Sequence, residues 1–188
     1  MRRIQYNAPV ILTYTLIAFA IFLLSLLTNG RTNTFFILQP RFYLLNTLRM
    51  VTYVFGHADF GHFVGNFSII LLIGPIMEEK YGSKNLMLMM LTTALLTAII
   101  HILFFNTALL GASGIVFMLI LLTPFTNTAT GKIPLTLILV AVIYIGREIF
   151  LGITVVDNVS RFAHIIGGVI GACLGFLVKR KKEKGGYR

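Results

Sequence analysis

Apolar residues in this sequence gather into six long stretches, at about 9–28, 62–79, 85–105, 112–125, 134–151 and 161–178. A helix needs about 20 apolar residues to cross the hydrocarbon core of a bilayer, and fewer where it does not reach both faces. The chain is 57% hydrophobic and 12% charged, whereas soluble domains carry about 25% charged residues. The sequence therefore predicts an all-α membrane protein, a polytopic bundle of six transmembrane helices.

The distribution of basic residues predicts the orientation of this bundle. Six of the sixteen Lys and Arg residues lie in the segment 179–188. Placing both termini in the cytoplasm puts eleven basic residues inside and five outside, as the positive-inside rule requires. A basic cluster directly after a span binds anionic lipid headgroups. We therefore expect a six-helix domain over 1–178 in the cell membrane and a basic cytoplasmic tail over 179–188, with the lipid bilayer and no nucleic acid as partner.

The longest connection, about 29–61, is predicted to form an interfacial loop between the first two spans. It is too polar to span a membrane and too apolar to be a solvated linker, so short helices half sunk in the headgroups fit best. Arg49 is expected to pair with backbone carbonyls in this loop. Glu78 and Glu79 are expected to mark the cytoplasmic interface, and His101 is expected at the outer interface without an evident partner.

The fourth apolar stretch is short and opens with Gly111, Ala112, Ser113 and Gly114. Pro124 disfavours helical geometry at the residue before it and so marks the end of this helix. The two glycines allow a sharp turn and the close approach of a carbonyl group. The first turn of a helix also favours a developing oxyanion. By itself, the tetrapeptide is more typical of ordinary small-residue helix packing.

His164 begins the last apolar stretch and shares a helical face with Gly168, Gly171 and Gly175. Such a stripe of small residues lets two helices approach closely, which would carry the imidazole against a neighbouring helix. An ionisable residue within a span indicates a functional site by default. The alternative is a packing face on which the histidine only caps or hydrogen-bonds.

His57, His62 and Asn66 form an H-x4-H-x3-N pattern. His62 and Asn66 lie four residues apart, so they share a helical face and could both donate to one oxygen atom. The nearest acid is Asp59, at the interface between the histidines. Because no carboxylate or thiolate offers a third ligand in the same layer, neither a metal site nor a cofactor is expected.

A depth estimate brings the polar residues together. At a rise of roughly 1.5 Å per residue, Ser113, His164, His62 and Asn66 stand about 18, 21, 22 and 16 Å above the cytoplasmic boundary of their helices. Polar residues from three helices are therefore expected in one submerged layer toward the outer face. Irregular backbone before Ser113 is tolerated at that depth only inside protein or beside a water-filled cavity.

Together these residues resemble the rhomboid family of intramembrane serine proteases. The resemblance covers most of the chain and rests on four elements in order: H-x4-H-x3-N at 57–66, G-x3-E-x3-G at 74–82, G-x-S-G at 111–114, and the histidine before a glycine stripe at 164–168. It implies Ser113 as nucleophile and His164 as general base and acid. It further implies an oxyanion site formed by the Ser113 backbone N–H, His62 and Asn66.

The resemblance also implies supporting positions and a substrate class. Phe117 is expected against the imidazole of His164, with Gly111, Gly114 and Gly168 as supporting residues. Substrates would be single-span membrane proteins that enter laterally and unwind, because a helical peptide hides its carbonyls in hydrogen bonds. The family's outer loop usually carries a Trp-Arg pair, whereas this chain has Leu48-Arg49 and no tryptophan. This difference affects how the loop is expected to sit in the membrane and does not affect the expected chemistry.

Two other functions stay open at this point. One is a catalytically inactive rhomboid-like protein that binds membrane segments without cutting them. The other is a small transporter with His62, Asn66 and His164 along its pathway. A transporter predicts polar residues that continue toward the cytoplasm, yet the lower halves of these spans are almost wholly aliphatic.

Overall fold

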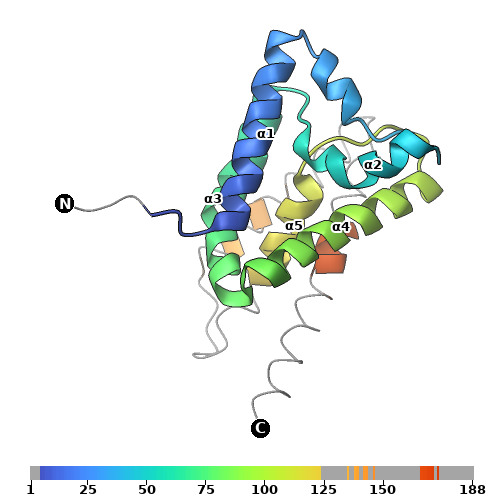
Figure 1. Ribbon diagram of the computed structural model, residues 1–188. Helices are drawn as coiled ribbons and strands as arrows, with labels where there is room; N and C mark the ends of the chain where they lie inside the picture. Colours follow the sequence, from blue (N-terminus) through green and yellow to red (C-terminus); the bar gives the residue numbers. More distant parts are fainter. Residues whose placement is uncertain are drawn as a thin grey trace.

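A computed structural model of the chain describes residues 5–123, together with 135, 138, 139, 142, 143, 146, 166–171 and 173. Over this part of the chain the regular structure is helical, and the one β-type pairing is an isolated bridge between Leu38 and Leu109. The elements of Figure 1 are, in order, α1 (Pro9–Leu27), η1 (Arg31–Phe35), α2 (Leu44–Thr52), η2 (Tyr53–Phe55), α3 (Phe60–Tyr81), α4 (Ser83–Phe104) and α5 (Ser113–Leu122).

Three of these helices, α1, α3 and α4, are long and apolar enough to cross a membrane, and α5 is a shorter apolar helix of 10 residues. They coincide with the first four predicted stretches, and the chain is a membrane protein. The predicted spans at 134–151 and 161–178 contain few described residues, so the number of six spans stays a prediction. The basic tail at 179–188 lies outside the described residues.

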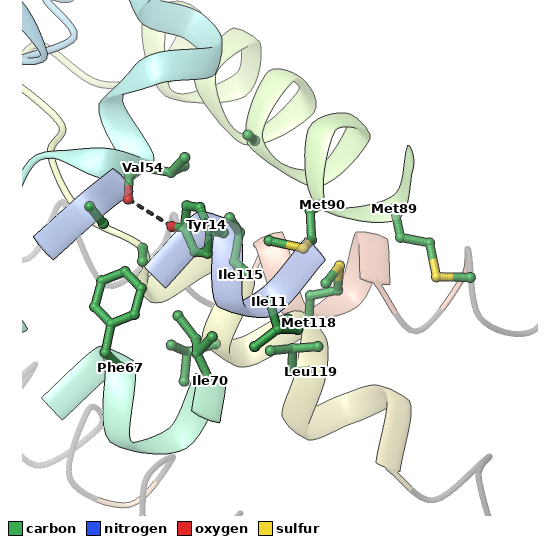
Figure 2. Packing of buried hydrophobic residues seen from close by; sticks show 14 of the residues in the cluster. Ile11, Tyr14, Val54, Phe67, Ile70, Met89, Met90, Ile115, Met118 and Leu119 are labelled. Carbon is green, nitrogen blue, oxygen red and sulfur yellow. Dashed lines mark hydrogen bonds between the residues drawn. The ribbon is translucent and has the colours of Figure 1, made fainter. Parts of the chain in front are cut away.

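The short helix α5 occupies the centre of the described bundle. It packs against α3 and α4, and α1 lies against α3 (Figure 1). Figure 2 shows how Ile11 and Tyr14 of α1, Ile70 of α3, and Ile115 and Met118 of α5 meet in one apolar core. A helix that is apolar on every side is stable only when it is surrounded. This packing fixes the position of the first turn of α5.

Glu78, expected at the cytoplasmic interface, is buried within the protein and binds backbone groups of α1. Its side chain is 4% exposed, and its carboxylate accepts hydrogen bonds from the backbone N–H groups of Val10 and Ile11, each at 3.0 Å. The hydroxyl of Ser83 donates to the same carboxylate at 2.7 Å. The first N–H groups of a helix have no intrahelical acceptor, and a negative charge there is favoured by the helix dipole. Glu78 therefore caps α1 from α3, next to the contact between Gly74 and Ile11.

We expect the substitution Glu78→Ala to lower the free energy of unfolding by about 3 kcal/mol, because it leaves buried N–H groups without their charged acceptor. The neighbouring Glu79 is exposed. Glu79→Ala removes the same charge and is expected to change stability by less than about 0.5 kcal/mol. Thermal unfolding of both variants in one detergent measures the difference. Equal losses of stability in the two variants would show that the negative charge alone, and not the capping of α1, stabilises the protein.

The segment between α4 and α5, residues 105–112, is irregular and is held by the loop between α1 and α3. Leu38 and Leu109 exchange two backbone hydrogen bonds of 3.0 and 2.9 Å, and the N–H of Gly111 donates to the carbonyl of Tyr53 at 3.0 Å. The same segment covers His101, which is fully buried and donates from Nε2 to the Thr107 carbonyl at 2.8 Å. His101 therefore has a partner, contrary to expectation, because the chain folds back over it.

The loop between α1 and α3 is organised around Arg49. Its Nε donates to the carbonyl of Phe35 at 3.1 Å and one terminal nitrogen donates to the carbonyl of Thr34 at 2.9 Å, as the sequence predicts. Backbone carbonyls buried away from water need such donors. The arginine thus ties η1 to α2 and gives the loop a defined shape above the bundle.

Candidate active site

Ser113 is the first residue of α5 and is 5% exposed. The loop that presents it turns at Gly111, whose φ of +119° lies in a region that side chains rarely adopt. A Cβ at Gly111 would stand 2.6 Å from Cε1 and Nε2 of His62 and 3.8 Å from Nδ2 of Asn66. Only a glycine leaves room there. The imidazole of His62 and the amide of Asn66, both from α3, therefore lie beside the loop that carries Ser113.

His57 connects these parts, and the sequence assigned it no role beyond its place in the motif. Its side chain is fully buried; Nδ1 lies 3.3 Å from the Phe55 carbonyl, and Nε2 lies 3.1 Å from Nδ2 of Asn66. The N–H of Ala112 also donates to Nε2, at 3.4 Å. This set of partners assigns a neutral ring with its proton on Nδ1. His57 thus joins Asn66 to the residue directly before Ser113.

The backbone and ring of His57 are fixed from other sides as well. Nδ2 of Asn33, in η1, donates to the His57 carbonyl at 2.7 Å. The rings of Phe63 and Phe67 lie with their centroids 5.5 and 5.3 Å from the imidazole. The signal available in the sequence was the placement of His57 after an apolar segment, Tyr53–Phe55, where a histidine is either buried with partners or functional. The tertiary structure shows it buried with partners.

Burial lowers the pKa of His57 to about 3, with a smaller effect of the same direction from His62. In an unfolded chain the pKa is near 6.5. The folded state therefore resists protonation, and its stability is complete above pH 6.5 and declines as the pH falls toward 3. We expect a loss of about 2 kcal/mol at pH 5 relative to pH 7.5. The variant His57→Gln keeps a hydrogen-bond acceptor but does not titrate, so its thermal unfolding is expected to depend less on pH. An unchanged pH dependence would show that His57 is not the group responsible.

The described segment 166–171 lies against α5. A Cβ at Gly167 would stand 2.8 Å from both Cα and the carbonyl oxygen of Gly114, so the two backbones are in direct contact. A Cβ at Gly168 would stand 3.3 Å from Cβ of Phe117, and one at Gly171 would overlap Met118. Gly167, Gly168 and Gly171 thus pack on the face of α5 that includes Gly114 and Phe117. His164 lies outside the described residues, and its pairing with Ser113 and Phe117 stays a prediction.

Helix α3 and the segment 166–171 therefore meet at the first turn of α5. The loop at Gly111 contacts His62 and Asn66 of α3, and Gly114, directly after Ser113, contacts Gly167. A hydroxyl at a helix N-terminus beside an imidazole and an amide is an arrangement in which backbone and side-chain donors can surround one oxygen atom. Two of the four sequence elements, at 57–66 and 111–114, form this site, and residues 166–168 of the fourth lie against it, whereas the element at 74–82 lies near the other end of α3, where Glu78 caps α1.

Comparison with known proteins identifies the family. The model of the rhomboid domain matches residues 45–181. Among curated proteins from Arabidopsis thaliana, the chain is 30% identical to RHOMBOID-like protein 6, mitochondrial, over 141 residues, which is 73% of this chain and 45% of that protein. It is 29% identical to RHOMBOID-like protein 2 over 147 residues, or 73% and 44% of the two chains. The chain spans less than half the length of these relatives, and by the domain match it belongs to the rhomboid family.

Proposed function

We propose that this protein is an intramembrane serine endopeptidase that cleaves transmembrane segments with a dyad of Ser113 and His164. The observation that carries the proposal is the contact of Gly111 with the imidazole of His62. It places polar groups of α3 beside the loop that presents Ser113 at the start of α5. Membership of the rhomboid family supports the same chemistry.

The oxyanion site is proposed to consist of the Ser113 backbone N–H and the side chains of His62 and Asn66. The N–H groups of a first helical turn point out of the helix end, where the dipole is positive. Asn66 is 2% exposed and is oriented by its contact with His57. Donors fixed in this way stabilise a tetrahedral intermediate without reorganising during the reaction.

His164 is proposed as the base because its neighbours in the chain lie against α5. It precedes Gly167 by three residues, and three residues span at most about 11 Å. Gly167 in turn contacts Gly114, the residue after Ser113. A neutral His164 would take the proton of the Ser113 hydroxyl while the Ser113 oxygen attacks a peptide carbonyl. The proton then passes to the leaving amine, and water hydrolyses the acyl-enzyme.

The substrates are proposed to be single-span membrane proteins that enter from the side. Their helices must unwind at the site, since carbonyls within a helix are already hydrogen-bonded. Small and helix-breaking residues near the outer end of the substrate span would favour this step. With both termini of the protein in the cytoplasm, as the charge distribution predicts, cleavage takes place in the outer half of the membrane.

Labelling with a fluorophosphonate probe tests this proposal directly, because the probe reacts with activated serine hydroxyls. We expect labelling of the purified protein and its loss in Ser113→Ala. Ser68 of α3 is exposed, and Ser68→Ala serves as the matched control that keeps full labelling. Absence of labelling in folded protein would contradict the protease proposal and favour a rhomboid-like protein that binds membrane segments without cutting them.

A further inference from the structure

The helix α2 of the outer loop exposes apolar side chains and buries polar ones. Leu44 and Leu48 are 90% and 67% exposed, and Leu45 is 48% exposed. On the other side, Asn46 is 1% exposed and Arg49 is 9% exposed. This arrangement is unfavourable in water, whereas an interfacial helix buries its apolar side among acyl chains. The exposed side of α2 therefore faces lipid.

A polar cavity of about 500 Å³ lies at the N-terminal end of α2, lined by Gln39, Arg41, Tyr43 and Arg49. Residues 28–58 contain three arginines and neither aspartate nor glutamate. The one acid that follows, Asp59, accepts from the N–H of His62 at the start of α3 and does not line the cavity, so the loop places no carboxylate against the two arginines of the cavity. An anion from outside the loop is the matching partner.

Donors in this cavity remain available for an anion. A guanidinium has five N–H donors, and the hydrogen bonds of Arg49 to Phe35, Thr34 and Tyr43 use three of them. The Tyr43 hydroxyl accepts from Arg49, so its own hydrogen can be donated. The side chain of Arg41 is exposed and lies on the same cavity. Arginine donors in this geometry match two oxygens of a phosphate group.

The walls of the cavity are fixed before any ligand binds. Oδ1 of Asn46 accepts from the N–H of Gln39 at 3.0 Å, and Nδ2 of Asn46 donates to the carbonyls of Gln39, at 2.7 Å, and Arg41. Residues 39–41 are thereby held against α2. The N-terminus of α2, a helix of nine residues, adds its positive dipole end at Tyr43. Such preorganisation lowers the entropic cost of binding.

We propose that this cavity binds the phosphate diester of a phospholipid, whose acyl chains lie along Leu44 and Leu48. The binding anchors the outer loop in the leaflet that α2 enters. This inference is independent of proteolysis, because none of its residues belongs to the proposed dyad or oxyanion site.

The experiment titrates the full-length protein in a neutral detergent with dioleoylphosphatidylglycerol and counts bound lipid by native mass spectrometry. We expect Arg41→Gln to weaken binding about tenfold or more, the loss of one hydrogen-bonded charge. Arg31 is also exposed in this loop but lies outside the cavity. Arg31→Gln removes the same charge and is expected to weaken binding less than about twofold. Thermal unfolding confirms that both variants are folded.

Three results would overturn the proposal. Equal losses in the two arginine variants would indicate attraction by net charge alone. Equally tight binding of dioleoylglycerol, which lacks the phosphate, would indicate an apolar contact only. Displacement of the lipid by an excess of inorganic phosphate would indicate a site for free phosphate.

The variant Leu48→Trp provides a second measurement, because the chain has no other tryptophan that would fluoresce. Brominated phospholipids are expected to quench this fluorescence. Lack of quenching would contradict insertion of α2.

Discussion

Ser113→Ala and His164→Ala are each expected to abolish cleavage of a single-span substrate, a rate loss of about 10⁴-fold or more. Without the hydroxyl there is no nucleophile, and without the imidazole the hydroxyl keeps its proton. Because the two groups act in one step, their effects are not additive. The double variant is therefore expected to be no slower than either single variant.

Cleavage is measured with the protein reconstituted in vesicles with a panel of single-span substrates that differ in small and helix-breaking residues near the outer end. Ser68→Ala is the control and is expected to cleave at the wild-type rate. Losses that multiply in the double variant would mean that Ser113 and His164 act independently. Persistent cleavage in Ser113→Ala would eliminate this serine as nucleophile.

Gly111→Ala is expected to reduce the cleavage rate about 10²-fold or more. A Cβ at this position would stand 2.6 Å from the His62 ring, and the φ of +119° adds backbone strain of about 1–3 kcal/mol. To relieve the contact between this Cβ and the His62 ring, either the imidazole or the loop before Ser113 has to move. Loss of one oxyanion donor by itself costs about 10²–10³-fold in rate.

The matched control for Gly111→Ala is Gly65→Ala on α3. A Cβ at Gly65 would have nothing within 4 Å, so this variant is expected to keep the wild-type rate and stability. Turnover and thermal unfolding are measured for both variants. Full activity in Gly111→Ala would show that the position of His62 beside this loop is unimportant for catalysis, and would remove the main support for the proposed oxyanion site.

Local sequence was sufficient for the helices and for the start of α5. The apolar stretches that predicted α1, α3 and α4 are set by bilayer thickness, which requires a minimum run of apolar residues whatever the tertiary contacts are. Small residues before Ser113 likewise indicated where α5 begins. By contrast, hydropathy gave no partner for Glu78 or His101, which were expected near the membrane interfaces. Both are buried with backbone partners from other segments.

The sequence by itself determined that this chain is a helical membrane protein, which residues could perform its chemistry, and which family it resembles. These properties follow from composition and short motifs. Only the tertiary structure decided that His57 is a neutral connector between Asn66 and the Ser113 loop, and that Arg49 and Asn46 shape a cavity beside α2. Hydrogen bonds between residues far apart in the chain carry no local signature, because each depends on where the packing of other elements brings its partner.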